Sequence, residues 1–146
     1  MQVRILSLPP NMNTKQIGTI CELKVATGLL QKGYIVSLPL GENCPYDLIF
    51  DNGSGLYRVQ CKNGILRGGS IKAKLESVHY RADEGKVTSK GIDKTQTDYI
   101  GIYCSELESV YLVNINDVGS TQCNLRVDEV KSSQIKGIRW ANDYKI

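Results

Sequence analysis

The residues best suited to chemistry lie in two strand-like runs near the middle of the chain, at 45–50 and 56–62. Asp47 is in the first run, and Gln60 and Lys62 stand two residues apart in the second. Side chains two residues apart on a strand share one face. Polar and charged groups on an otherwise apolar sheet usually do chemistry, so the pattern predicts a functional site on the face that these groups share.

A tight turn must bring these residues together. Residues 52–55, Asn-Gly-Ser-Gly, suit a four-residue hairpin loop, and the flanking runs are rich in strand formers. Closing the hairpin there pairs Asp51 with Leu56 and places Asp47 opposite Gln60. Side chains alternate along strands, so two faces are expected. One carries Asp47, Arg58, Gln60 and Lys62, and the apolar face carries Leu48, Phe50, Tyr57, Val59 and Cys61.

A further carboxylate precedes the hairpin on a predicted helix over residues 15–32. Asn13 or Thr14 can cap this helix, and Gly33 suits its end. Glu22 has small or apolar neighbours at positions i−4, i+4 and i+7, an unfavourable place for a solvated carboxylate. We expect it to belong to the site, and the alternative is a Glu at the edge of an amphipathic face.

The order of these groups along the chain resembles the PD-(D/E)xK nuclease superfamily. A helical Glu is followed by a strand Asp and then by an oxygen ligand, one residue and Lys. The most specific matching stretches are Tyr-Asp-Leu-Ile at 46–49 and Tyr-Arg-Val-Gln-Cys-Lys at 57–62, with further similarity at 97–104 and 109–113. The chain is most similar to the branch that includes homing endonucleases of group I introns, from about residue 15 to 127.

The resemblance implies an α/β fold with a restriction-endonuclease-like core, in which helices flank a mixed central sheet. It also implies a Mg²⁺-dependent endonuclease that hydrolyses phosphodiester bonds in double-stranded DNA, a sequence-specific homing enzyme. One or two Mg²⁺ ions would be held by Asp47, the Gln60 side-chain oxygen, the Cys61 backbone carbonyl and Glu22. Lys62 would serve the attacking water, so the expected catalytic residues are Glu22, Asp47, Gln60 and Lys62.

Two positions depart from the superfamily pattern. Gln60 stands where most members carry Asp or Glu, and Tyr46 separates Pro45 from Asp47. The amide oxygen of Gln60 can coordinate Mg²⁺ but brings no negative charge. We therefore expect a lower metal affinity, in part restored by Glu22. Two alternatives remain open: a Holliday-junction resolvase or repair-type nuclease, and a non-catalytic DNA-binding module whose catalysis was lost through Gln60.

The partner is indicated by local charge rather than by the total. The net charge is only +3, but eight basic and four acidic residues between Lys62 and Lys94 leave +4 there and −1 in the rest of the chain. Such a stretch beside a catalytic strand is suited to phosphates or base edges. The predicted DNA contacts are Arg67, Lys72, Lys74, Arg81, Lys86 and Lys90.

Length and composition indicate one domain, over residues 1–146, that can bury one core. No apolar run is long enough to cross a bilayer, and the N-terminus lacks a secretory pattern, so a cytoplasmic protein is expected. The five cysteines form no Cys-x-x-Cys pair and are interpreted as reduced thiols. The single histidine, His79, has no obvious partner for metal binding.

Chemistry also predicts a homo-oligomer. One chain carries one site, so cutting both strands of a duplex calls for two sites related by a two-fold axis. We expect at least a dimer, and the homing branch implies a tetramer.

Outside the hairpin, the pattern predicts further strands separated by loops. Strands are expected at 33–38, 71–78, 99–104, 110–114 and 124–127, with a flexible loop at 64–70, an irregular polar segment at 80–96 and a short helix at 139–144.

Overall fold

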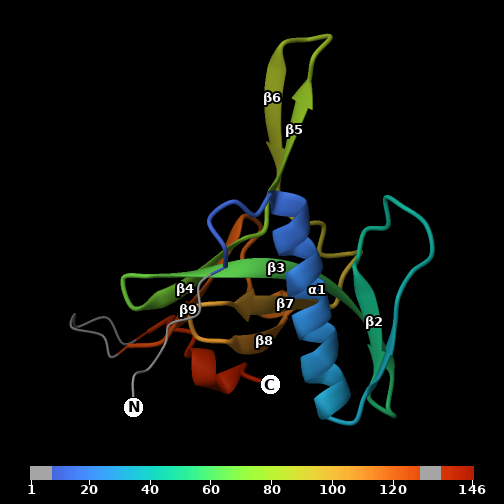
Figure 1. Ribbon diagram of the computed structural model, residues 1–146, viewed down its shortest axis with the longest axis vertical. Coiled ribbons are helices and arrows are strands. Elements are labelled where there is room, and N and C mark those ends of the chain that lie inside the picture. Colours follow the sequence, from blue (N-terminus) through green and yellow to red (C-terminus); the bar gives the residue numbers. More distant parts are fainter. Residues whose placement is uncertain (1–7, 129–135) are drawn as a thin grey trace.

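The computed structural model describes residues 8–128 and 136–146. One α-helix, α1 (Thr14–Gln31), precedes the strands (Figure 1). The strands are β1 (Ile35–Ser37), β2 (Leu48–Asp51), β3 (Leu56–Arg67), β4 (Ser70–Lys74), β5 (Ser77–Arg81), β6 (Lys86–Lys90), β7 (Tyr99–Cys104), β8 (Ser109–Asn114) and β9 (Gln122–Arg126). There are also two 3₁₀ turns. The first, η1 (Ile115–Asp117), follows β8, and the second, η2 (Ala141–Asp143), lies near the C-terminus.

The predicted helix is confirmed with its caps. Asn13 is the N-cap residue and forms a capping box with Gln16, because each side chain accepts a hydrogen bond from the other residue's backbone N–H. After the last turn, Gly33 has a φ of 84°, a conformation that residues with a Cβ rarely adopt. The two ends of α1 were therefore encoded locally.

The hairpin of β2 and β3 has the predicted register. Asp51 pairs with Leu56 and Leu48 with Val59, and Asn52 closes the turn by accepting hydrogen bonds from the backbone N–H groups of residues 54 and 55. The predicted apolar face is confirmed, because its five residues belong to one cluster packed beneath α1: Leu48, Phe50, Tyr57, Val59 and Cys61.

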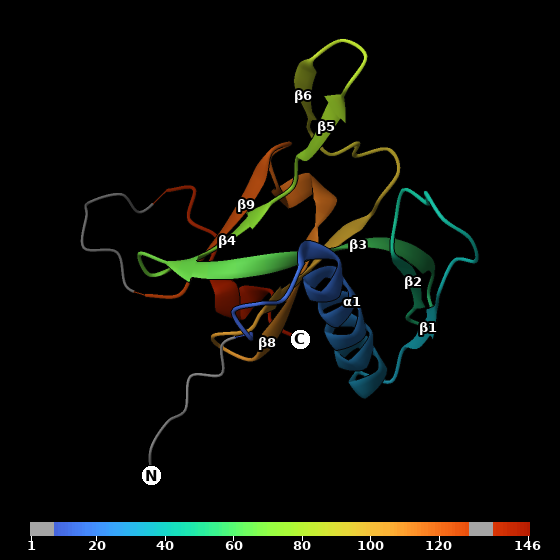
Figure 2. The same ribbon diagram turned by 45° about the horizontal axis from the view of Figure 1, so that its top comes forward.

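Strand β3 is the central strand of the fold, because it belongs to two parts of the sheet. Residues 59–64 of β3 pair in parallel with β7, which continues to β8, while residues 65–67 pair antiparallel with β4, which continues to β9. On its other side β3 pairs with β2, and β2 with β1. We call β4, β9 and the 65–67 end of β3 the outer leaf. Figures 1 and 2 show it on the opposite side of the molecule from β1 and β2.

Two hydrophobic clusters hold these layers together. The first lies between α1 and strands β1 to β3 and includes Val25 and Leu29 of the helix. The second lies between β7–β8 and the outer leaf, and includes Ile102, Ile71 and Leu125. The sheet thus has α1 over one face and the outer leaf folded toward the other.

Two glycines allow these layers to approach closely. A Cβ on Gly64 would lie 2.6 Å from Ile71 Cγ2 and 2.7 Å from Ile102 Cγ2, and one on Gly101 would lie 2.7 Å from Val25 Cγ1. Real Cβ atoms essentially never come so near. The two positions therefore require glycine because of packing, on opposite faces of the sheet.

The predicted flexible loop at 64–70 is wrong. Residues 64–67 continue β3, and only Gly68 and Gly69, with φ of 57° and 74°, form the turn into β4. Glycines usually weaken a strand, so Gly64 favoured a loop on local grounds. The close packing that requires Gly64 is a tertiary feature, and it extends the strand.

The prediction of one strand at 71–78 followed by an irregular segment is also wrong. Strand β4 ends at Lys74, and β5 and β6 form a separate two-stranded sheet. Figures 1 and 2 show this hairpin projecting from the rest of the molecule. All side chains of these two strands whose burial is described are exposed, so the polar pattern of the segment gave no strand signal.

The fold class is confirmed as a mixed α/β sheet structure, although the described residues contain a single α-helix. The predicted C-terminal helix is reduced to η2. All five cysteines are free thiols, as expected. Within residues 8–128 and 136–146, no helix has the length and apolar character needed to cross a membrane.

Candidate active site

Asp47 is fixed immediately before β2, against the part of β3 that carries the predicted motif. Its backbone N–H donates to the Val59 carbonyl at 2.9 Å, and its carboxylate Oδ2 accepts from the Cys61 N–H at 2.7 Å. These two contacts flank Gln60, so Asp47 lies against this stretch of β3, next to the Leu48–Val59 pair that ends the register. The backbone therefore holds one oxygen of the carboxylate and leaves the other for further partners.

Glu22 reaches Asp47 from α1. The pKa of the Glu22 carboxyl is raised by burial first, then by the negative charge of Asp47 and by a side-chain hydrogen bond with it. Burial also raises the pKa of Asp47, although the Cys61 N–H, the charge of Lys62 and Glu22 act in the opposite direction. Two carboxyl groups thus face each other in a place that disfavours their joint ionisation.

Gln60 and Lys62 belong to the face of β3 turned away from α1. Both line a pocket of about 380 Å³, together with Cys44, Pro45, the start of β5 and the segment after β6. Lys62 also lowers the pKa of Asp47 through its charge, so the pocket and the carboxylate pair are electrostatically connected. The structure thus connects Glu22, Asp47 and Lys62 through their charges, and Gln60 shares a pocket with Lys62.

Metal ligation at this place would depend on mixed donors. Within the described ranges no three His, Cys, Asp or Glu side chains cluster in a way that could hold a metal ion. Two carboxylates, an amide oxygen and a backbone carbonyl remain the available oxygen donors: Glu22, Asp47, Gln60 and Cys61. Oxygen donors of this kind fit Mg²⁺. A cation between the carboxylates would also offset the repulsion that raises the pKa of Glu22.

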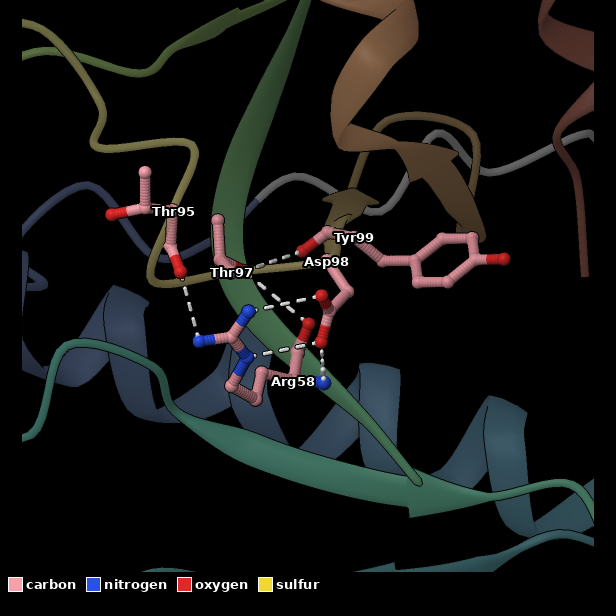
Figure 3. A network of polar contacts seen from close by, with 5 residues as sticks. All are labelled: Arg58, Thr95, Thr97, Asp98 and Tyr99. Atoms are coloured by element: carbon pink, nitrogen blue, oxygen red, sulfur yellow. Dashed lines mark hydrogen bonds and ion pairs between the residues drawn. The ribbon is translucent and has the colours of Figure 1, made fainter. Parts of the chain in front are cut away.

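Arg58, on the same face of β3 as Gln60, anchors the start of β7 (Figure 3). Its Nε and Nη2 donate to the two oxygens of Asp98, each at 3.0 Å, and its Nη1 donates to the Thr95 carbonyl. The Asp98 carboxylate also accepts from the Arg58 N–H, and Arg58 lowers the pKa of that carboxyl. These contacts of Arg58 hold in place the end of the segment that forms one wall of the Gln60 pocket.

The six predicted DNA contacts fall into two groups. Arg67, Lys72 and Lys74 lie on β3 and β4 and line a groove of about 880 Å³ that also includes Lys62. The other three lie on the projecting β5–β6 hairpin: Arg81, Lys86 and Lys90. Lys90, at the base of the hairpin, lines the Gln60 pocket. Both groups thus adjoin cavities that meet at Lys62.

Several lining residues were not found from the sequence. Asn63 and Gln122 line the large groove, and Asp93 and Gln96 line the Gln60 pocket. Gln122 follows the outward-facing alternation of β9, a signal that was available. The segment containing Asp93 and Gln96 is irregular, and contacts distant in sequence hold it beside the site, among them the Arg58–Asp98 ion pair and the hydrogen bond from the Ile92 N–H to the Ser120 carbonyl.

Comparison with known proteins identifies the family of the chain and a structure of similar fold. The family model described as PD-(D/E)XK endonuclease matches residues 12–146. A solved structure of the bacterial homing endonuclease I-Ssp6803I has a similar fold, with a TM-score of 0.73 and 21% sequence identity over 92% of this chain and 89% of that one. No curated protein matches the sequence. Because the family match covers residues 12–146, almost the whole sequence, the chain belongs to the PD-(D/E)XK endonuclease family.

Proposed function

We propose that this protein is a Mg²⁺-dependent endonuclease that hydrolyses phosphodiester bonds in double-stranded DNA, and that it is a sequence-specific homing endonuclease. The observation that carries the proposal is the pair of facing carboxyl groups, Glu22 and Asp47, beside Lys62 on β3. Membership of an endonuclease family supports the reaction class. The fold shared with a bacterial homing endonuclease supports the more specific role.

In this proposal each residue has a separate task. Glu22, Asp47, the Gln60 side-chain oxygen and the Cys61 carbonyl would hold the cation. When bound, a divalent cation would supply positive charge at the scissile phosphate and lower the pKa of a water molecule. Lys62 would orient the attacking water and offset the negative charge that develops on the phosphate. The Cys61 N–H keeps the Asp47 carboxylate in position.

The central test is cleavage by a Lys62→Ala variant. Supercoiled plasmids carrying candidate intron-insertion sites are incubated with purified protein and Mg²⁺, and linear product is measured over time. We expect the wild type to linearise a target plasmid and Lys62→Ala to be slower by a factor of about 10² or more, the usual contribution of a positioned acid–base group. Lys32→Ala, an exposed lysine at the far end of α1, is the matched control.

Equal cutting by the wild type and Lys62→Ala would remove Lys62 from the mechanism. The alternative functions give different results in the same assay. A junction resolvase or repair-type nuclease would cleave a four-way junction in preference to linear duplex. A non-catalytic module would bind DNA equally well with Ca²⁺ or Mg²⁺ and would never nick it.

A further inference from the structure

The outer leaf has one buried face and one face whose side chains are exposed or half-buried, bordered at Ser70, Asn124 and Arg126 by residues 137–139. Its inward side chains, among them Ile71, Ala73, Cys123 and Leu125, pack in the second hydrophobic cluster. The strand register places the outward side chains in cross-strand rows. These rows are Arg67–Ser70–Arg126 and Ile65–Lys72–Asn124, followed by the pair Lys74–Gln122.

This outward face is cationic. Arg67, Lys72 and Lys74 are exposed on it, and Arg126 is held there by the Asp128 carbonyl and the Ser70 hydroxyl. No acidic residue occupies a paired position of the three strands, all of which are described. A sheet face with this charge is complementary to a nucleic-acid backbone.

The face is continuous with the candidate active site. Lys72, Lys74 and Gln122 line the groove of about 880 Å³ that also contains Lys62. A duplex whose scissile phosphate lies at Lys62 would therefore extend along this groove onto the outer leaf. The outward amides of Gln122 and Asn124 stand directly beside Lys74 and Lys72 in the register.

We propose that the outward face of the outer leaf is a DNA-reading platform, on which Gln122 and Asn124 contact base edges while Lys72 and Lys74 contact phosphates. Lysine contacts to phosphate position a protein without reading sequence. Amide side chains can donate and accept at once, and they pair with adenine in the major groove, which admits β-strands. The platform is thus a determinant of target choice from a strand, β9, that the sequence did not implicate.

The first experiment measures sequence preference without cleavage, and it rests on the proposed function. A pool of duplexes with a randomised segment is selected for binding to the full-length protein in Ca²⁺ and then sequenced. We expect the wild type to enrich a defined sequence. Gln122→Ala and Asn124→Ala should each relax the preference by about tenfold at one or two base pairs. Gln31→Ala, an exposed amide at the end of α1, should keep the wild-type preference.

The second experiment measures salt dependence with one fixed duplex of mixed sequence. Lys72→Ala and Lys74→Ala should each reduce the slope of log K against log salt by about 1, since each removes one phosphate contact. Lys32→Ala should leave the slope unchanged. Gln122→Ala should also leave it unchanged, because a base contact releases no counterion.

The outcomes separate this inference from the proposed function. A wild type that binds no duplex would contradict both. A wild type that binds and cleaves DNA, while Gln122→Ala and Asn124→Ala both retain its full preference, would overturn the platform and leave the nuclease intact. An unchanged salt slope in both lysine variants would do the same.

Discussion

At the scale of single residues, the candidate site contains two carboxyl groups, Glu22 and Asp47, whose ionisation destabilises the folded protein. Burial raises the pKa of both Glu22 and Asp47, and the negative charge of Asp47 raises that of Glu22 further. A carboxyl group whose pKa is raised by folding binds its proton more strongly in the folded state. The destabilisation of the folded protein by such a group is therefore absent at low pH, where the group is protonated in both the folded and the unfolded state. It is complete once the pH exceeds the pKa of the group in the folded state.

The upward shift of the Glu22 pKa on folding leads to a prediction for Glu22→Gln. In EDTA at neutral pH, the variant should have a higher free energy of unfolding than the wild type, on the order of 0.5 kcal/mol, as is typical when an active-site strain is relieved. The difference should fade as the pH is lowered through the pKa of Glu22. Urea denaturation at several pH values measures it, with exposed Glu42→Gln as the control.

The same variant tests metal binding apart from catalysis. Millimolar Mg²⁺ should stabilise the wild type against urea and have a smaller effect on Glu22→Gln, because a ligand that binds only the folded state adds to stability. A wild type that gains nothing from Mg²⁺, and is no less stable than the variant in EDTA, would count against the carboxylate pair as a cation site.

At the scale of elements, β3 links the reaction to substrate binding. Its middle carries Gln60 and Lys62, and its end joins the outer leaf. Gly64 lies between these two parts, at the point where the strand leaves β7 and begins to pair with β4. The close packing at this glycine therefore fixes the angle between the active site and the outer leaf.

Gly64→Ala should destabilise the protein by about 1–3 kcal/mol, the usual cost of overpacking a core. The added methyl group would meet Ile71 and Ile102 at distances that require one of them to move. Gly18→Ala is the matched control, because nothing lies within 4 Å of its Cβ position and alanine is favoured by about 0.5–1 kcal/mol in a helix. Thermal and urea unfolding measure both. A Gly64→Ala protein as stable as the wild type would contradict the role of Gly64 packing at the point where β3 changes its partner from β7 to β4.

At the scale of the whole molecule, the exposed apolar side chains indicate contacts between copies. Ile35, Leu38 and Leu40 are 66%, 65% and 100% exposed at the β1 edge and in the loop after it, and Leu23 and Leu30 are 61% and 55% exposed one heptad apart on α1. Where large exposed apolar side chains gather into a patch, the patch is typical of an interaction site. A single candidate site per chain gives a functional reason for the same expectation.

We therefore expect sedimentation equilibrium to give a mass of at least two copies of the 16.2 kDa chain. Dilution should not dissociate the assembly at concentrations where it linearises plasmid. A species that stays at the mass of one chain, both free and on DNA, would refute the oligomer and would predict nicking in place of double-strand cleavage. The contribution of the helix can be measured with Leu23→Lys, which should weaken assembly without touching the Asp47 region.

Much of the site could be predicted because its signals are local. The turn at 52–55 and the alternation of β3 placed Asp47 beside Gln60, and the capping residues defined the helix that carries Glu22. Turn chemistry, capping and period-two patterns depend on neighbours in sequence, so they can be read before any packing is known.

Tertiary structure alone decided how those local pieces meet. Only packing distinguishes Gly64 as a strand residue from a loop glycine, and only the folded chain brings Glu22 to Asp47 and Arg58 to Asp98 across 25 and 40 residues. The β5–β6 hairpin escaped prediction because its described side chains are exposed, so no hydrophobic pattern marks its strands. The sequence by itself determined which groups could do chemistry, while the packing of β3 against α1 and the outer leaf decided where those groups lie.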